Sequence, residues 1–437
     1  MTQVQNLTPT TAWSPLEKAA FRLFFLYFLL QIVPINWKFY HSLFTLHWPL
    51  DLSEIVQLSR YLPRFQAQES FLDWLILALG AATGSILWGA WDKRRPEYHQ
   101  EYYWLKALVR YRLALGIMAY GFLKVFHLQM PAPTLSELNT NYGDFLPWKI
   151  YWLTTGLASA SYETVIGLIE LGAGLLLLYR RTATFGAAIA AAFLLNVIAV
   201  NLFYEVGDLV YSAFLLTLAL FLLVQDVPRV VNLLLLERPT AANKVRVTIS
   251  AGWFKLLQLA VKSVTVFSLA ILGYLALQEN AQKQESQSGA LSAEAGCYQV
   301  REFKLNGKLL PFSQTDSVRW HDVVIEKWPT LSINRGPGHS AVTPITKTGT
   351  QVPAEAAGNG GRQYFKLKVD SLRQTLTMLP LHQDQKIEQW ELRYRKPSAA
   401  TLVLSGRNER QDSLYVVLDK VEKDYLLYKG RRKPVTL

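Results

Sequence analysis

Long apolar stretches alternate with shorter polar segments through the first 277 residues of the chain. Seven of these stretches approach or exceed the roughly 20 residues that a helix needs to cross the hydrocarbon core of a bilayer. They lie at Ala19–Pro34, Phe71–Trp91, Tyr103–Val125, Tyr162–Tyr179, Thr182–Leu202, Val206–Val224 and Trp253–Leu277. The pattern therefore predicts a membrane α-helical bundle with about seven transmembrane helices.

Lysine and arginine residues gather in alternate loops between these stretches. They occur around Arg94 after the second stretch, at Arg180 and Arg181 after the fourth, and from Arg229 to Lys255 after the sixth. Loops rich in Lys and Arg stay on the cytoplasmic side of a membrane. We therefore expect the N-terminus inside the cytoplasm and everything after Leu277 outside it.

The two longer outer loops carry aromatic clusters. The first cluster includes Trp37 and Trp48, and it is followed by Asp51–Glu54, which can cap a short helix. The second cluster lies around Trp148 and Trp152. Such rings settle at the bilayer interface, so the loops are expected either to anchor there or to form a lid across a pocket.

The hydrophobic period changes after residue 278. Glu279–Ser288 is polar and rich in Gln, which is typical of a linker, and Asn306-Gly307 is the strongest short hairpin motif that a sequence can show. The expected strands are Tyr298–Leu310 as a hairpin, Asp322–Glu326, Tyr364–Asp370, Gln374–Met378, Gln389–Arg395, Thr401–Leu404, Leu414–Val421 and Tyr425–Tyr428. Short strands at this spacing predict an antiparallel β domain, either a barrel or a sandwich. Asn334–Arg362, rich in Gly, Pro and Thr, is expected to be a long mobile loop.

These patterns predict five regions along the chain. They are an N-terminal two-span region with an interfacial outer loop (1–102), a four-helix membrane module (103–226), a cytoplasmic loop with the last span (227–278), a linker (279–295) and an extracytoplasmic β domain (296–437).

Composition and charge exclude several classes of protein. The 437 residues are 51% hydrophobic and only 18% charged, whereas soluble chains average about 25% charged residues. The single cysteine, Cys297, excludes a disulfide scaffold, a CxxC redox pair and a thiolate zinc cage. The net charge is +12, but the basic residues lie at the ends of apolar segments and in the C-terminal region. Membrane lipid, rather than nucleic acid, is therefore the expected partner.

Ionisable and polar side chains within the predicted spans are candidate site residues, because charge is expensive inside a bilayer. Lys124 and Glu170 are the catalytic candidates. The ligand-binding candidates are Arg110, Arg112, Tyr120, Glu163, Asn196, Asn201, Tyr204, Glu205 and Asp208. Opposite charges on successive helices suggest buried pairs, for example of an arginine with Glu170, and such pairs could also serve only to hold the bundle together. No histidine lies in the middle of a span, so neither haem nor zinc is expected.

Three segments together resemble the DoxX family of four-helix membrane modules. Arg112–Lys124 is similar to its opening Arg…Gly…Gly-x-x-Lys helix, Glu170–Thr182 to its acidic, Gly-rich second helix, and Asn196–Asp208 follows at the expected distance. The resemblance covers residues 103–226. It implies a membrane protein, and some family members are linked to quinone-dependent sulfur oxidation. Together with the charge of the loops, it leads us to expect a multi-pass protein of the bacterial cytoplasmic (inner) membrane with a periplasmic C-terminal domain.

The same stretch resembles, more distantly, the HTTM-like membrane domain of vitamin K-dependent γ-carboxylase. That resemblance implies that Lys124 is the base that deprotonates reduced vitamin K. This chain departs from the carboxylase pattern at Asn196, where the family has a histidine. An asparagine cannot shuttle a proton.

Three functions remain open from the sequence. The leading hypothesis is a DoxX-like protein that binds a quinone or similar amphiphile in an outward-facing helical pocket, either as a binder or as a subunit of a quinone-linked oxidoreductase whose electron donor sits on a partner. The alternative is a non-enzymatic receptor, lipid-handling or assembly factor, whose β domain binds an extracytoplasmic or membrane partner. The third is a carboxylase-like enzyme.

Overall fold

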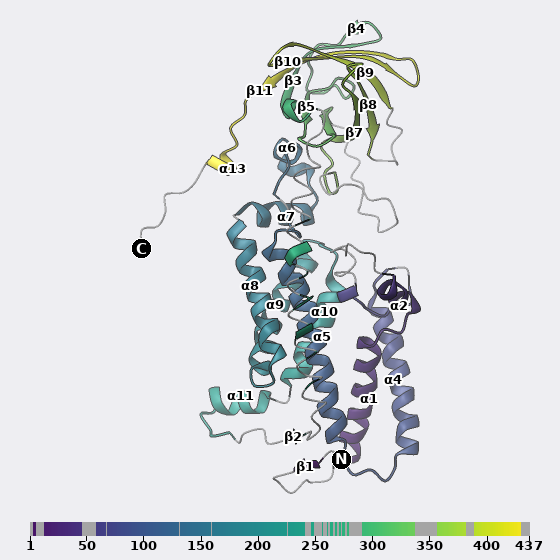
Figure 1. Cartoon of the computed structure of the whole chain (residues 1–437), viewed down its shortest axis with the longest axis vertical. Coiled ribbons are helices and arrows are strands. Elements are labelled where there is room, and N and C mark those ends of the chain that lie inside the picture. Colours follow the sequence, from purple (N-terminus) through teal and green to yellow (C-terminus); the bar gives the residue numbers. More distant parts are fainter. Residues whose placement is uncertain are drawn as a thin grey trace. The chain divides into compact units, whose positions relative to one another are not determined.

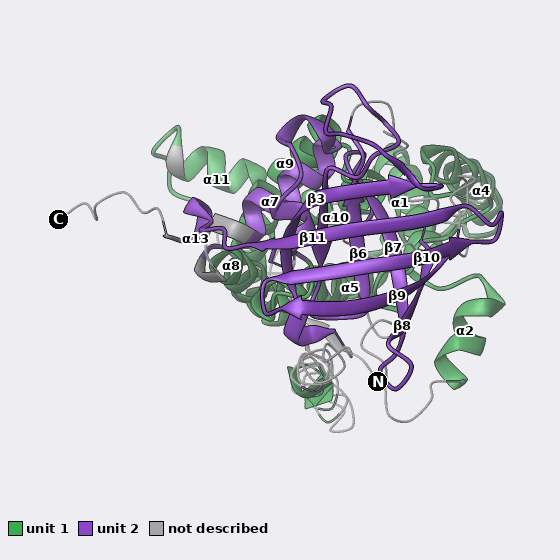
Figure 2. Cartoon of the chain, turned by 90° about the horizontal axis from the view of Figure 1, so that it is seen from above, with its two compact units in different colours: residues 1–129, 163–277 green, residues 130–162, 278–437 purple. Residues whose placement is uncertain are grey.

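The computed structural model (Figure 1) describes residues 3–5, 13–45, 58–66, 68–130, 132–158, 160–224, 226–240, 246–248, 291–336, 356–381 and 389–429, with scattered positions from 256 to 278. The chain forms two compact units. One contains Met1–Gln129 and Glu163–Leu277, and the other contains Met130–Tyr162 and Gln278–Leu437 (Figure 2). We call them the helical unit and the barrel unit.

The helical unit is built from long helices that match the predicted apolar stretches. They are α1 (Pro15–Ile32), α4 (Phe71–Trp91), α5 (His99–Val125), α8 (Ala160–Leu178), α9 (Ala183–Phe203) and α10 (Leu209–Leu223). The eight-residue helices α2 (Trp37–Phe44) and α11 (Val227–Leu234) lie in predicted loops. Local sequence sets their starts: Ser14 and Glu17 form a capping box at α1, and the Ser70 hydroxyl accepts a hydrogen bond from Leu72 N at α4. A short strand pair, β1 (Gln3–Gln5) and β2 (Arg246–Thr248), completes the described part of this unit.

Two of the described helices, α4 and α9, are by themselves long and apolar enough to span a membrane. Counting each bent pair, α1 with α2 and α10 with α11, as one span raises the number to four at most. The predicted helical region is therefore confirmed, whereas a total of seven spans stays a prediction. The seventh stretch, Trp253–Leu277, and the short helix expected after Asp51 lie largely outside the described residues.

Apolar side chains lie on both the inside and the outside of the helical unit. Its core contains Leu105 and Leu113 of α5, Ala190 of α9 and Leu218 of α10. Large apolar residues are also exposed along the helices, among them Leu75, Leu79, Ile86, Leu168, Leu195 and Phe203. A bundle that is apolar all round is typical of a membrane environment.

Glycines allow α5 and α8 to approach closely. A Cβ atom added at Gly121 would lie 2.9 Å from the carbonyl oxygen of Gly167, and one at Gly174 would overlap Met118. In the structure Gly167 and Gly174 face α5, and Gly186 of α9 provides the close contact with α8. The glycines thus set the spacing of the helices that carry Lys124 and Glu170.

The barrel unit contains a closed antiparallel sheet. Its strands are β3 (Gly296–Leu305), β4 (Lys308–Leu309), β5 (Asp322–Ile325), β6 (Thr330–Asn334), β7 (Gln363–Asp370), β8 (Thr375–Pro380), β9 (Trp390–Ser398), β10 (Thr401–Asn408) and β11 (Ser413–Val421). The order is β11-β10-β9-β8-β7-β6-β5-β3, and β3 pairs with β11 to close an eight-stranded barrel, with β4 paired on β3. Alternating inward residues such as Phe303, Ile333 and Leu392 fill the interior.

The structure decides between the predicted barrel and sandwich, and it corrects two local predictions. The Asn306-Gly307 turn is confirmed, since both residues have positive φ (52° and 75°) and join β3 to β4. Tyr425–Tyr428 is not a strand, because Leu426–Lys429 forms a helical turn, α13. Strand β6 was not predicted, and part of the expected loop, 337–355, lies outside the described residues.

The segment between α5 and α8 belongs to the barrel unit. It contains α6 (Leu135–Leu138), a 3₁₀ turn (Tyr142–Asp144) and α7 (Pro147–Ala158). We call residues 130–162 the insert. Backbone hydrogen bonds join it to the segment before β7, from Leu146 N to Gly358 O (3.0 Å) and from Gly360 N to Asp144 O (2.8 Å).

Candidate functional site

Lys124 and Glu170 form a buried ion pair in the helical unit. Lys124 lies in the last turn of α5, Glu170 lies in the middle of α8, and the two residues are 8% and 4% exposed. The ammonium Nζ donates to both carboxylate oxygens of Glu170, at 2.6 and 2.8 Å. The two catalytic candidates are thus brought together, and the partner of Glu170 is Lys124 rather than Arg110 or Arg112.

Two aromatic rings flank the Lys124 ammonium. Its Nζ lies 5.6 Å from the centre of the Tyr120 ring and 5.5 Å from that of Phe193 on α9. Ring faces attract a cation and exclude water. The ammonium is therefore held in an apolar, aromatic frame that a flat ligand could share.

Tyr120 connects this pair to a second polar cluster around Asp208. The Tyr120 hydroxyl donates to Asp208 Oδ2 (3.1 Å), and Arg60 Nη2 lies 2.7 Å from Asp208 Oδ1. Asp208 is the residue before α10, and its backbone N–H donates to Asn201 Oδ1 (2.8 Å) in the last turn of α9. Four residues from separate elements thus meet at one end of the bundle.

Arg60 is held between rings as well as by charge. Its guanidinium lies 5.4 Å from the Tyr211 ring centre and 5.8 Å from that of Tyr120, and Glu69 lies 4.0 Å away. Burial lowers the pKa of Arg60, but the influence of Tyr120 and Asp208 outweighs it and raises the pKa overall. Arg60 therefore stays a cation.

The other predicted ligand-binding residues lie elsewhere in the helical unit. Arg112 Nη2 donates to Tyr61 O (2.8 Å), and Arg110 lies over the ring of its neighbour Tyr111. Glu163, 1% exposed, is at the start of α8. Asn196, Tyr204 and Glu205 are exposed, on α9 or the turn that follows it.

Sequence reasoning missed Arg60, Glu69, Tyr211 and Phe193. Phe193 and Tyr211 lie in apolar stretches, where nothing distinguishes them from core residues. Arg60 could have been found, because it lies in a predicted outer loop, on the same side as the acidic turn at Asp208. Opposite charges on one side of a bundle are candidate partners. Among the described residues, no group of His, Cys, Asp and Glu side chains is arranged to hold a metal ion.

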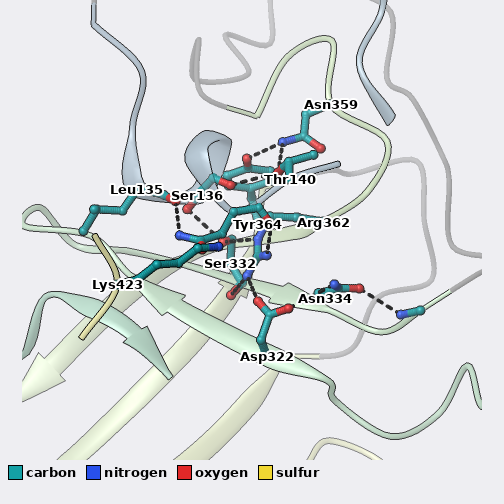
Figure 3. A network of polar contacts seen from close by, with 12 residues as sticks. Leu135, Ser136, Thr140, Asp322, Ser332, Asn334, Asn359, Arg362, Tyr364 and Lys423 are labelled. Carbon is teal, nitrogen blue, oxygen red and sulfur yellow. Dashed lines mark hydrogen bonds and ion pairs between the residues drawn. The ribbon is translucent and has the colours of Figure 1, made fainter. Parts of the chain in front are cut away.

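A second buried polar network lies in the barrel unit and centres on Arg362 (Figure 3). Its guanidinium donates to Ser332 Oγ (2.8 Å), to Asn139 O of the insert (3.0 Å) and to Asp322 Oδ1 (2.6 Å). The Ser332 hydroxyl in turn donates to Ser136 Oγ (2.8 Å). Arg362 therefore joins strands β5 and β6 to the insert.

The start of α6 is tied to the barrel by Glu326, which directly follows β5. Glu326 Oε1 accepts hydrogen bonds from the Ser136 backbone N–H (2.7 Å) and hydroxyl (2.6 Å). Further along the insert, Glu137 forms a buried ion pair with Lys149 of α7. Burial raises the pKa of Tyr425, whose hydroxyl accepts from Asn139 Nδ2 (2.6 Å). Buried polar groups that are bonded in this way specify one arrangement, so this network anchors the insert.

Fold and site define a class: an apolar helical bundle of membrane type with a buried Lys–Glu pair, combined with an antiparallel β-barrel. No family model matches the chain, and no solved structure matches it. The chain is 32% identical over 122 residues, 28% of its own length and 77% of the relative's, to a protein of Bacillus subtilis (strain 168) described as uncharacterized protein YwoB. It therefore belongs to the same family as YwoB. The relative is uncharacterized, so the match identifies a family and no activity.

Proposed function

We propose that the helical unit is embedded in a membrane and binds a quinone or similar amphiphile beside Lys124. The observation that carries the proposal is the ammonium of Lys124, which is buried, held by Glu170 and flanked by the rings of Tyr120 and Phe193. Binding sites for such ligands are apolar, with a few polar groups that fix orientation.

The chemistry of the pair suits a carbonyl ligand. An ammonium has three N–H donors, and the two oxygens of Glu170 occupy at most two of them. The third N–H can donate to a quinone oxygen, while the ring of the ligand stacks on an aromatic face. Glu170 orients the ammonium through two hydrogen bonds, which makes Lys124 the donor and Glu170 the positioning residue.

A contribution to folding stability does not account for the presence of a buried ion pair. Removing two charges from water costs more than their attraction returns in many proteins, and apolar replacements of the same volume are often neutral or stabilising. The cost is higher still within a bilayer. The presence of Lys124 and Glu170 at buried positions of the bundle therefore supports a role in binding.

The barrel unit contains segments from two separate parts of the chain, and this arrangement supports the proposed topology of about seven spans. The insert and the strands form one unit, so both must lie on the same side of any membrane that the helices cross. An even number of crossings must separate residues 162 and 278. The crossings that we propose between them are α8, α9, the bent pair α10 and α11, and the apolar stretch Trp253–Leu277, which makes four. We propose a multi-pass protein of the bacterial cytoplasmic membrane with the barrel unit outside the cytoplasm.

Co-purification of ligand tests the proposed function. The full chain is purified in mild detergent, and its extract is analysed for quinones and phospholipids by mass spectrometry. We expect quinone near stoichiometric amounts in the wild type and its loss in Lys124→Met. Lys106→Met, the same change elsewhere on α5, should keep the ligand.

The paired variant Lys124→Met/Glu170→Gln separates binding from folding, because it leaves no unpaired buried charge. We expect it to be folded and free of quinone. A folded paired variant that retains wild-type quinone, or a wild type that carries phospholipid alone, contradicts the proposal.

A further inference from the structure

The outer face of strands β7 to β10 carries more basic than acidic side chains. Alternate residues of these strands point away from the barrel interior, and the exposed ones include Lys366 and Lys368 on β7, Arg393 and Arg395 on β9, and Arg407 on β10. The strands are neighbours in the sheet, and β8, β9 and β10 lie side by side in Figure 2. We call these five residues the basic face.

The strand register places the charges of the basic face in successive rows across the sheet. One row runs Lys368, Thr377, Glu391, Arg407, and the next runs Asp370, Thr375, Arg393, Ser405. Neighbouring strands are about 4.8 Å apart. Within the described residues, Lys366, Lys368, Arg393 and Arg395 form no ion pair. The five cations outnumber the two exposed carboxylates in these rows, Asp370 and Glu391, so the face keeps a net positive charge.

An apolar side chain projects beside this face. Leu372, in the turn between β7 and β8, is 99% exposed, and the exposed Arg373 follows it. The turn is well ordered by hydrogen bonds, since Asp370 Oδ1 accepts from the backbone N–H groups of Leu372 (3.0 Å) and Arg373 (3.1 Å). The turn therefore holds a leucine outward, next to cations.

We propose that the basic face and the turn at Leu372 dock on the surface of an anionic lipid bilayer. Lys and Arg side chains attract acidic headgroups, and each one near the surface contributes to binding. An apolar residue between them inserts below the headgroups. An acidic polymer would explain the charges, but it would not explain the exposed leucine, so lipid is the occupant that both features favour.

Because the barrel unit is covalently linked to the helical unit, a weak affinity for lipid is sufficient for it to dock. The chain passes between the two units after Gln129, after Tyr162 and after Leu277. A barrel linked in this way to helices of membrane type experiences a high effective concentration of lipid. The docking energy needed is then much smaller than that of a freely diffusing domain.

The experiment uses the full chain reconstituted into vesicles. Cys297→Ser/Ser371→Cys is labelled at the turn with an environment-sensitive fluorophore, and the vesicles contain phosphatidylcholine alone or with phosphatidylglycerol. We expect a blue shift of emission only with phosphatidylglycerol, reversed by high salt, which screens exposed charges. Lys368→Glu/Arg393→Glu should lower the ratio of docked to free barrel by roughly tenfold or more.

A charge-matched control is Lys308→Glu/Lys327→Glu, which changes two exposed lysines away from the basic face. This variant should keep most of the blue shift, and circular dichroism should show that both variants retain the barrel. Equal emission in both lipid mixtures overturns the proposal. So does an equal loss in the two variants, which would indicate net charge alone, or binding of soluble polyanion without any response to phosphatidylglycerol.

Discussion

Lys124 and Glu170 are two charged side chains whose burial costs less free energy as a pair than it would for either residue alone. We predict that Lys124→Met or Glu170→Gln alone destabilises the protein by about 3–5 kcal/mol, because each leaves the partner buried without its counter-charge. The paired variant should be more stable than either single variant. Thermal unfolding of the four proteins in one detergent measures the coupling.

An exposed pair provides the control for that cycle. Arg301 and Asp419 are 3.2 Å apart on the barrel, with side chains 62% and 36% exposed. Arg301→Met and Asp419→Asn should each change stability by less than ~1 kcal/mol. Additive effects at Lys124 and Glu170, like those expected here, would show that the buried pair is not coupled.

Cys297 gives a second test at the residue scale, because it is the only thiol in the chain. Burial raises the pKa of Cys297, with a smaller contribution from Asp322 in the same direction. The reactive thiolate is therefore scarce at neutral pH and forms only as the pH rises above the ordinary thiol pKa of about 8.5. We expect alkylation by iodoacetamide at pH 7.5 to be at least ~10-fold slower than for an exposed thiol.

Cys297→Ser/Leu372→Cys supplies that exposed thiol, since Leu372 is 99% exposed. The alkylation rate of this exposed thiol should rise with pH around the ordinary thiol pKa, while the alkylation rate of Cys297 should rise only at higher pH. Equal rates at neutral pH would show that the Cys297 site is open to solvent.

At the scale of elements, the spacing between α5 and α8 depends on glycine. We predict that Gly121→Ala destabilises the helical unit by about 1–3 kcal/mol, because the new Cβ would lie 2.9 Å from Gly167 O and 3.0 Å from Glu170 Cβ. Gly172→Ala on α8 has no atom within 4 Å of its Cβ and should be neutral or slightly stabilising.

Thermal unfolding and ligand content distinguish the two glycine variants. Gly121→Ala should also reduce any bound quinone, since it displaces Glu170 and hence Lys124. If both variants behave alike, the helices are not in close contact at Gly121.

Most elements could be predicted from the sequence because their patterns are local. Alternation in Leu414–Val421 and the turn residues Asn306-Gly307 determine strand and hairpin without reference to distant residues. The sequence pattern did not predict strand β6, because its five residues follow a Trp-Pro and precede a Gly-rich segment. Tyr425–Tyr428 has strand-forming composition, but no strand in the described part of the chain pairs with it, and composition alone does not make a strand.

The charged residues of the candidate site could be predicted from the sequence, but the residues with which they pair could not. Burial cost identifies Lys124 and Glu170 from the sequence alone. The choice of Lys124 over the arginines depends on helix rotation, and the role of Arg60 depends on a loop packing on the bundle. Both are tertiary features that no periodicity records.

At the scale of the whole molecule, the insert is part of the barrel unit. We predict that 291–437 expressed alone is less stable, by at least ~2 kcal/mol, than the same segment linked to residues 130–162. Without the insert, Ser332 and Arg362 lose hydrogen-bond partners, and each lost partner at a buried group costs about 1–3 kcal/mol. Both proteins should show β-type circular dichroism, and their melting temperatures give the difference.

Ser136→Ala in the linked protein is the matched control for the network. It removes the hydroxyl that donates to Glu326 and accepts from Ser332, and it should lose part of the gain. If the insert adds nothing to the melting temperature, the observed contacts do not stabilise the barrel.

The barrel unit is built from two separate segments of the chain, and this delays its folding during synthesis. Ser136 and its partner Glu326 are 190 residues apart in the chain. A ribosome that adds about 5–20 residues per second needs roughly 10–40 seconds to cover that distance. During this interval the insert has left the ribosome, and the strands whose residues bond to its Ser136 do not yet exist. Synthesis, rather than chain collapse, therefore sets the earliest moment at which the barrel unit can close.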